Sequence, residues 1–133
     1  MKYDCLFIGN AIVDILTDVS FEYMHDQGIE PGSWRPVEKE EIEKLQSAIT
    51  NITVASGGSA ANSAVGLSFL GGSSAFIGRV KNDNLGLDYI KDMDDAGVKF
   101  SSNPSKSGLD TGRCLVYVTP VSYTHLTLPT SSQ

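Results

Sequence analysis

The chain has 133 residues, which predicts a single domain, and its 16 acidic and 10 basic residues give a formal net charge of −6. This balance argues against nucleic acid or an anionic membrane surface as a partner, because both are themselves negatively charged. With 41% apolar and 20% charged residues, the composition excludes a globally disordered chain.

The N-terminal segment lacks the pattern of a secretory signal. Lys2 is its only basic residue, and Asp4 and Asp14 interrupt the apolar stretch. Cys5 and Cys114 each lie among apolar, strand-like neighbours, which favours two buried reduced thiols over a disulfide. We therefore expect a cytoplasmic protein.

The first half of the chain predicts two extended segments and a helix. Residues 3–8 form an apolar run that stops at Gly9 and Asn10, as a buried strand does at a turn, and residues 12–19 form a second extended piece. Over residues 38–50 the apolar positions recur at helical spacing behind an acidic first turn. This pattern predicts an amphipathic helix.

The second half alternates helices with strands. We expect a small-residue helix over 59–67 with Ser59 as its N-cap, a strand over 74–77, and a helix over 84–96 capped by Asp83. On the latter helix the apolar residues Leu87, Ile90, Met93 and Ala96 would share one face. Extended segments at 98–100 and 113–119 complete an order typical of a largely parallel α/β layer structure with helices on its faces.

The last 13 residues differ in composition from the rest of the chain. Residues 121–133 carry no charged side chain apart from a protonated His125, and they resemble the translated sequencing-adapter tails found at the ends of proteins from metagenomic assemblies. We expect residues 1–120 to be the domain and residues 121–133 to be a non-native tail. The alternative is a genuine Ser/Thr-rich end.

Several common functional motifs are missing from the sequence. It contains no GxxxxGK[ST] phosphate loop, no GxGxxG fingerprint, no HExxH motif and no Cys/His cluster. His25 and His125 are isolated, so no metal site is expected.

The segment GNAIVD (residues 9–14) follows the first predicted strand. It brings Asn10 and Asp14 to the carboxyl edge of the sheet, where α/β folds bind ligands. An aspartate there can accept hydrogen bonds from two vicinal hydroxyls, which suits a sugar. The alternative is that Asp14 is only a turn or cap residue.

The segment GGSAAN (residues 57–62) precedes the small-residue helix. The pair Gly57 and Gly58 lets the backbone approach a ligand at a helix N-terminus, and Asn62, one turn into the helix, offers both a donor and an acceptor. The alternative is a simple glycine turn with Asn62 exposed to solvent. A third segment, GGSSAFIGRVKND (residues 71–83), taken alone predicts only a helix stop, a strand and a capped helix start.

Taken together, these segments resemble the N-terminal half of the PfkB carbohydrate kinase family, which includes ribokinase and adenosine kinase. The resemblance covers residues 3–120 and includes LGG before the strand at 74–77, ND-x2-G at 82–86, and TGRC leading to VTP at 111–120. The adenosine-kinase-like branch fits best, because its members carry a stretch similar to GIEPGSW (residues 28–34). Ribokinase-like sugar kinases stay open.

The resemblance implies the N-terminal part of a ribokinase-like three-layer α/β/α sandwich with a small β lid, whose strands would include residues 33–37 and 113–117. It implies the substrate-binding half of an ATP-dependent kinase that phosphorylates the primary hydroxyl of a ribose-type sugar or nucleoside, with ATP and Mg²⁺ as cofactors. It also allows a homodimer of the full-length parent through the lid. The residues implied to hold the sugar are Asn10, Asp14, Gly57, Gly58 and Asn62.

Two departures from the family pattern matter. Many relatives have Gly-Asp-Asp where this chain has Lys81, Asn82 and Asp83. The family's Gly-Ala-Gly-Asp motif, which supplies the anion hole and the general base, lies in the C-terminal half and is absent here, as are the ATP-binding strands. We therefore assign no catalytic residue and expect this chain to be inactive alone. The rival hypotheses are a non-catalytic sugar- or nucleoside-binding module and an unrelated α/β structural domain.

Overall fold

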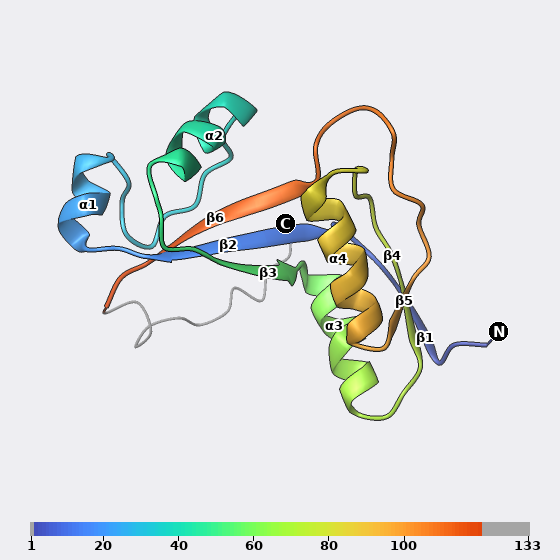
Figure 1. Cartoon of the computed structure of the whole chain (residues 1–133). Helices are drawn as coiled ribbons and strands as arrows, with labels where there is room; N and C mark the ends of the chain where they lie inside the picture. The colour runs from blue at the N-terminus through green and yellow to red at the C-terminus, as the bar shows by residue number, and fades with distance from the viewer. Residues whose placement is uncertain (1, 121–133) are drawn as a thin grey trace. The chain divides into compact units, whose positions relative to one another are not determined.

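The computed structural model describes residues 2–120 (Figure 1). These residues divide into two compact units: unit 1 comprises residues 2–14 and Ala55–Cys114, and unit 2 comprises Ile15–Val54 and residues 115–120. The elements in chain order are β1 (Cys5–Ile8), β2 (Ile12–Asp18), α1 (Phe21–Asp26), α2 (Lys39–Ser47), β3 (Thr53–Gly57), α3 (Ser59–Phe69), β4 (Ser74–Ile77), α4 (Asn84–Asp95), β5 (Val98–Phe100) and β6 (Gly112–Val118).

Unit 1 contains a parallel three-stranded sheet in the order β1-β4-β5. Phe7 of β1 pairs with Phe76 of β4, which pairs in turn with Phe100 of β5. Partners in a parallel register point their side chains to the same face, so these three aromatic residues share one face of the sheet. The expected parallel α/β arrangement is confirmed.

Helices α3 and α4 cover this aromatic face (Figure 1). The hydroxyl of Ser74 donates to the carbonyl of Ala64 in α3 at 2.8 Å, and the ring of Tyr89 in α4 lies 6.3 Å from Phe76 and 5.9 Å from Phe100. Phe76 and Tyr89 are completely buried. Burying such a side chain contributes roughly 1.5–3 kcal/mol, so this cluster is a main source of stability in unit 1.

The opposite face of the same sheet lies open. Leu6, Ile8 and Ile77 project from it and are exposed. Residues 2–120 thus supply the sheet and one covering helix layer of the three-layer arrangement that the resemblance implies.

Two details of the predicted helices are wrong. The N-cap of α3 is Gly58, and Ser59 is the first helical residue. On the face predicted for α4, Met93 is buried and Ile90 and Ala96 are half-buried, but Leu87 is 49% exposed, and Gly86 and Tyr89 are buried instead. The first turn of α4 determines which of its residues face the interior. A Cβ at Gly86 would overlap the carbonyl oxygen of Lys81, so only glycine fits at this inward-facing position.

The start of α4 is tied to the loop before β6. Asp83 caps the helix as predicted, accepting from the amide of Gly86 at 2.8 Å. It also accepts from the amide of Thr111 at 3.0 Å and from its hydroxyl at 2.6 Å. Burial raises the pKa of Asp83, but these hydrogen bonds together lower it below its ordinary value. Lys81, the departure from the family pattern, pairs with Asp110 at 2.7 Å in the same cluster.

Strands β3, β2 and β6 form a second sheet in that order, and each strand begins in one unit and ends in the other. Within unit 2 the amide of Val19 donates to the carbonyl of Val118 at 2.9 Å, and the Thr17 hydroxyl donates to the carbonyl of Asn51 at 2.8 Å. The expected strand at residues 113–117 is confirmed as part of β6.

Three elements of unit 2 and its boundary differ from expectation. Residues 33–37 are irregular, because Gly32 adopts a φ of +76° and Pro36 has no amide hydrogen to pair with a neighbouring strand. Helix α1 was not predicted. It has only six residues and depends on its N-cap, in which the Ser20 hydroxyl oxygen accepts from the amide of Tyr23. Strand β3 was also not predicted, because its Ala-Ser-Gly end has the composition of a turn.

Both cysteines are free thiols, and each is half-buried rather than fully buried as expected. Cys5 lies on an edge strand and Cys114 lies on β6, positions that leave part of each side chain accessible. Among residues 2–120 no helix is long and apolar enough to span a bilayer. The predicted tail, residues 121–133, lies outside the described residues.

Candidate substrate-binding site

Asp14 lies on β2 and contacts the glycine pair that precedes α3. A Cβ added at Gly57 would lie 2.5 Å from the Oδ2 atom of Asp14, so the carboxylate packs directly on the Gly57 backbone. Gly57 is buried and Asp14 is half-buried. Any larger residue at position 57 would displace the carboxylate.

Gly58 is in equally close contact with the other end of the GNAIVD segment. Its φ of +102° is a conformation that side-chain-bearing residues rarely adopt, and a Cβ there would overlap the carbonyl oxygen of Asn10. The segment before β2 and the turn before α3 therefore fit together only because position 58 is glycine.

Asn62 is joined to this turn through its backbone. Its amide donates to the carbonyl of Gly58 at 2.8 Å, which closes the first turn of α3. The side chains of Asn10 and Asn62 are exposed, so their polar groups are accessible to a ligand, and the alternative of a simple glycine turn with Asn62 in solvent stays open. The structure thus brings the backbone of all five predicted residues to one region of unit 1; their ligand-binding roles remain predictions.

Asp14 carries its negative charge in a partly desolvated position. Burial raises the pKa of its carboxyl above the ordinary value of 3.8. Burial, and then the charge of Asp14, also raise the pKa of the Tyr89 hydroxyl and of the Cys114 thiol. Both groups are therefore neutral at pH 7, which leaves Asp14 as the group of the three whose ionised form can accept from a ligand hydroxyl. Hydrogen bonds from ligand hydroxyls would be charge-assisted here.

Tyr89 hydrogen-bonds the backbone of the candidate site, and the sequence pattern did not predict this role. Its hydroxyl donates to the carbonyl of Gly57 at 2.8 Å, and both groups are buried. The helical pattern pointed to Leu87 instead, because leucine is the more typical core residue. Tyr89 follows the inward-facing Gly86 by three residues, and this helical spacing could have predicted that Tyr89 is buried.

We expect Tyr89→Phe to destabilise the fold by about 0.5–1.5 kcal/mol, because it keeps the ring contacts but removes one buried hydrogen bond. In an active kinase carrying residues 1–120, Tyr89→Phe should raise the KM for the acceptor more than it lowers kcat. Tyr89 holds the carbonyl of Gly57, and the Asp14 carboxylate packs on Gly57. Thermal unfolding and steady-state kinetics check both parts.

Ser63→Ala is the matched control, because it removes an exposed hydroxyl that donates to a backbone carbonyl in α3. It should leave the melting temperature and KM nearly unchanged. A Tyr89→Phe protein indistinguishable from wild type would remove Tyr89 from the support of the site.

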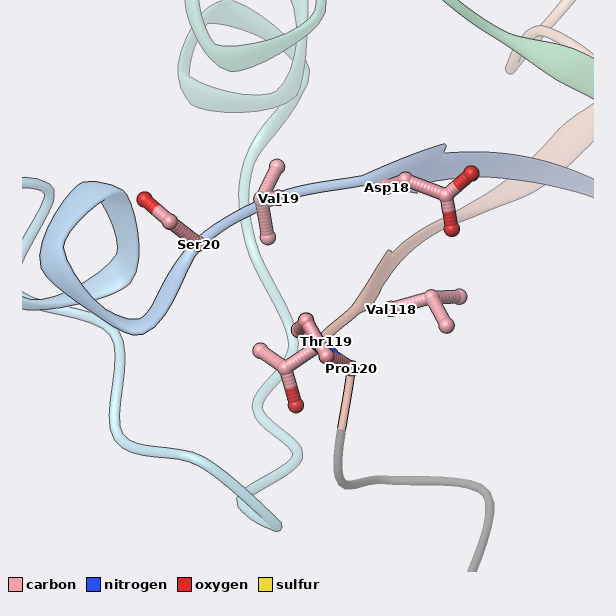
Figure 2. A pocket seen from close by; sticks show the side chains of 6 residues that line it. All are labelled: Asp18, Val19, Ser20, Val118, Thr119 and Pro120. Carbon is pink, nitrogen blue, oxygen red and sulfur yellow. The ribbon is translucent and has the colours of Figure 1, made fainter.

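An open depression lies elsewhere, in unit 2, where the chain leaves β2 and β6 (Figure 2). Val19, Val118 and Pro120 make much of its lining apolar, and none of the five predicted site residues contributes to it. Within residues 2–120 no group of three or more His, Cys, Asp or Glu residues is placed to hold a metal ion.

Comparison with known proteins identifies the family. The sequence profile of the pfkB family carbohydrate kinases matches residues 34–129, which is more than half of the chain. The chain belongs to the pfkB family. The matched range includes part of the predicted tail, whose origin stays a prediction.

Solved structures of pfkB relatives confirm the ribokinase-like α/β fold. An adenosine kinase from Sinorhizobium meliloti is 38% identical, with a TM-score of 0.81 over 90% of this chain and 37% of its own. A probable sugar kinase from Rhizobium etli is 35% identical, with a TM-score of 0.80 over 89% of this chain and 36% of its own.

A plant protein is also related in sequence. The "Probable fructokinase-7" of Arabidopsis thaliana is 46% identical over 54 aligned positions, and the alignment covers 37% of this chain and 16% of the plant protein. This pfkB chain therefore spans little more than a third of the length of the solved relatives and less of the curated one.

Proposed function

We propose that residues 1–120 form the acceptor-binding part of an ATP-dependent pfkB kinase that phosphorylates a primary hydroxyl of a ribose-type sugar or nucleoside. The observation that carries this proposal is the contact between the Asp14 carboxylate and the Gly57-Gly58 turn at the start of α3. A half-buried carboxylate beside exposed amide side chains suits a neutral, hydroxyl-rich ligand.

Asp14 would hold and orient the acceptor. A carboxylate can accept one hydrogen bond on each oxygen, which matches two vicinal hydroxyls of a ribose ring. Asn10 and Asn62 would add donors and acceptors at its rim. Fixing the ring in this way positions the hydroxyl that reacts and reduces the entropy that the reaction must lose.

The described residues do not fit a site for ATP and Mg²⁺. Asp83 is used by the cap of α4, Asp110 pairs with Lys81, and no acidic cluster suits a metal within residues 2–120. The family uses ATP and Mg²⁺, and we derive no step of phosphoryl transfer from these residues. The cytoplasmic location and the homodimer through the lid also remain predictions.

The test compares the 133-residue chain with a chimera in which residues 1–120 continue into the segment of the Sinorhizobium meliloti adenosine kinase that lies beyond the matched region. Each protein is assayed with ATP and adenosine, ribose or fructose. We expect the chimera to form product and the 133-residue chain to form none above background.

Product formation by the 133-residue chain alone would contradict the assignment of catalysis to residues outside it. A chimera that melts cooperatively yet phosphorylates none of the three acceptors would reject the proposed function. Cooperative folding together with acceptor binding by the 133-residue chain alone would favour a binding module.

A further inference from the structure

Asp83 accepts more hydrogen bonds than a helix cap requires. Its Oδ1 atom accepts from the amide of Gly86 at 2.8 Å and from the hydroxyl of Thr111 at 2.6 Å, and its Oδ2 atom accepts from the Thr111 amide at 3.0 Å. The Thr111 hydroxyl, which is buried, accepts in turn from the amide of Lys81 at 2.9 Å. Capping α4 needs only the first of these bonds, so the other bonds serve the segment of Thr111.

The chain that leads into β6 has little regular structure of its own. Between β5 and β6, residues 101–111 form no helix or strand apart from an isolated bridge that pairs Ser105 with Lys81. The ammonium group of Lys81 also pairs with the carboxylate of Asp110 at 2.7 Å. The bonds that Asp83 and Lys81 make to residues 110 and 111 therefore fix the point at which β6 begins.

The start of β6 lies against the segment that carries Asp14. Gly112 is the first residue of β6, and a Cβ added to it would lie 3.1 Å from the carbonyl oxygen of Ala11, just before β2. Strands β6 and β2 are neighbours in the second sheet. Burial, and then the charge of Asp14, raise the pKa of the Cys114 thiol on β6, so this part of β6 also lies near the carboxylate. Moving the start of β6 would therefore alter the surroundings of Asp14.

We propose that Asp83 is a positioning residue of the acceptor site, which acts through Thr111 by holding the start of β6 against residues 11–14. Asp83 itself would not touch the acceptor. The inference rests on the proposed function, because it concerns the acceptor that Asp14 would hold. Losing the Asp83–Thr111 bonds should weaken acceptor binding and leave ATP binding unchanged, since the described residues do not fit a site for ATP.

The test replaces Thr111 in the chimera and measures steady-state kinetics with whichever of adenosine, ribose and fructose it phosphorylates best. Thr111→Val keeps the shape of the side chain but removes the hydroxyl that joins Asp83 to the Lys81 amide. We expect the KM for the acceptor to rise about 10-fold or more and the KM for ATP to stay within about twofold. Thr111→Ser restores the hydroxyl and should keep both KM values within about threefold of wild type.

Ser74→Ala is the matched control for stability. The Ser74 hydroxyl is also buried, and it donates to the carbonyl of Ala64 at 2.8 Å, between β4 and α3. Its loss should lower the melting temperature by an amount similar to that of Thr111→Val but leave the KM for the acceptor unchanged. If the two variants change this KM equally, or if Thr111→Val changes the KM for acceptor and ATP equally, the proposal is wrong.

A double-mutant cycle tests whether Asp83 acts through Thr111. Asp83→Asn keeps an oxygen that can cap α4, but its amide group places a donor where Asp83 accepts a hydrogen bond. If the two residues act as one unit, the rise in acceptor KM in the double variant Asp83→Asn/Thr111→Val should equal that of the more affected single variant within about twofold. A rise equal to the product of the two single effects would contradict the proposal.

Amide hydrogen exchange gives a readout that requires no acceptor. In Thr111→Val the amides of residues 112–114 should exchange at least about 10-fold faster than in wild type, whereas those of β4 should be unchanged. Unchanged exchange at residues 112–114 would overturn the proposal whatever the activity. Faster exchange there in a folded chimera that phosphorylates no acceptor would reject the proposed function but support the positioning of β6 by Asp83.

Discussion

Asp14→Ala in the chimera is expected to lower kcat/KM for the acceptor by about 10²–10⁴, the factor that the loss of roughly 3–5 kcal/mol implies. The physical reason is that the half-buried carboxylate would accept two charge-assisted hydrogen bonds, each worth about 1.5–3 kcal/mol. The melting temperature without ligand should barely change, because the packing of the carboxylate on Gly57 that is lost is offset by removing the cost of its partial burial. Steady-state kinetics against acceptor concentration and one thermal melt measure both quantities.

Asp18→Ala is the matched control, since Asp18 lies on the same strand, is exposed and is not a predicted site residue. It should leave kcat/KM unchanged. The structure places Asp14 within β2, so the alternative of a turn or cap residue is wrong. If Asp14 has only a structural role in the strand, Asp14→Ala will instead lower stability by about 0.5–2 kcal/mol and leave catalysis nearly intact.

The raised pKa of Asp14 adds a dependence on pH. Only the ionised carboxylate accepts from both hydroxyls, so acceptor affinity should fall as the pH drops through its pKa. Because burial raises that pKa, the loss should begin at a higher pH than for an ordinary carboxyl group of pKa 3.8. Asp14→Ala should abolish this dependence.

Gly58→Ala is expected to lower the stability of the chimera by about 3 kcal/mol or more. A backbone conformation restricted to glycine, here a φ of +102°, accounts for about 1–3 kcal/mol of this loss. The rest comes from the overlap of the new Cβ with the carbonyl oxygen of Asn10, a backbone atom that can move only if the start of β2 moves. Acceptor affinity should fall as well, because Asp14 lies on that strand. Thermal and denaturant-induced unfolding measure the first effect.

Gly66→Ala supplies a control of opposite sign. Gly66 lies within the same helix-forming segment, has no atom within 4 Å of an added Cβ and does not have a positive φ. Its replacement should stabilise the chimera by about 0.5–1 kcal/mol through higher helix propensity. Equal effects of the two substitutions would show that the close approach of Asn10 to Gly58 does not exist.

The placement of the candidate site residues was predictable because these residue types have strong local preferences, whereas their ligand-binding roles stay predictions. Gly57 and Gly58 before a small-residue helix, and Asp14 shortly after a buried strand, are visible without a structure. The topology then brings them together, because strand ends and helix starts of an α/β fold meet at one edge. What the sequence did not show is the direct packing of the Asp14 carboxylate on Gly57, which depends on tertiary structure.

The errors have physical causes of the same kind. Ser59 is a good N-cap residue, but Gly58 takes that position because only glycine fits against Asn10. Leu87 has the right spacing for a buried face, but Gly86 packs against the carbonyl of Lys81, and Tyr89, three residues later, faces inward instead. In both places a tertiary contact overrides a local preference, as expected where a helix begins at a close-packed junction.

The most direct test of the acceptor site is a thermodynamic cycle on the chimera, measured by calorimetry. Adenosine and 2′,3′-dideoxyadenosine, which lacks both vicinal hydroxyls, are each bound to the wild-type protein and to Asp14→Ala. The account predicts that removing the hydroxyls weakens binding at least about 100-fold to wild type and less than about threefold to the variant, because both changes delete the same interaction. Equal weakening in both proteins would show that Asp14 does not hold the hydroxyls and would contradict the account.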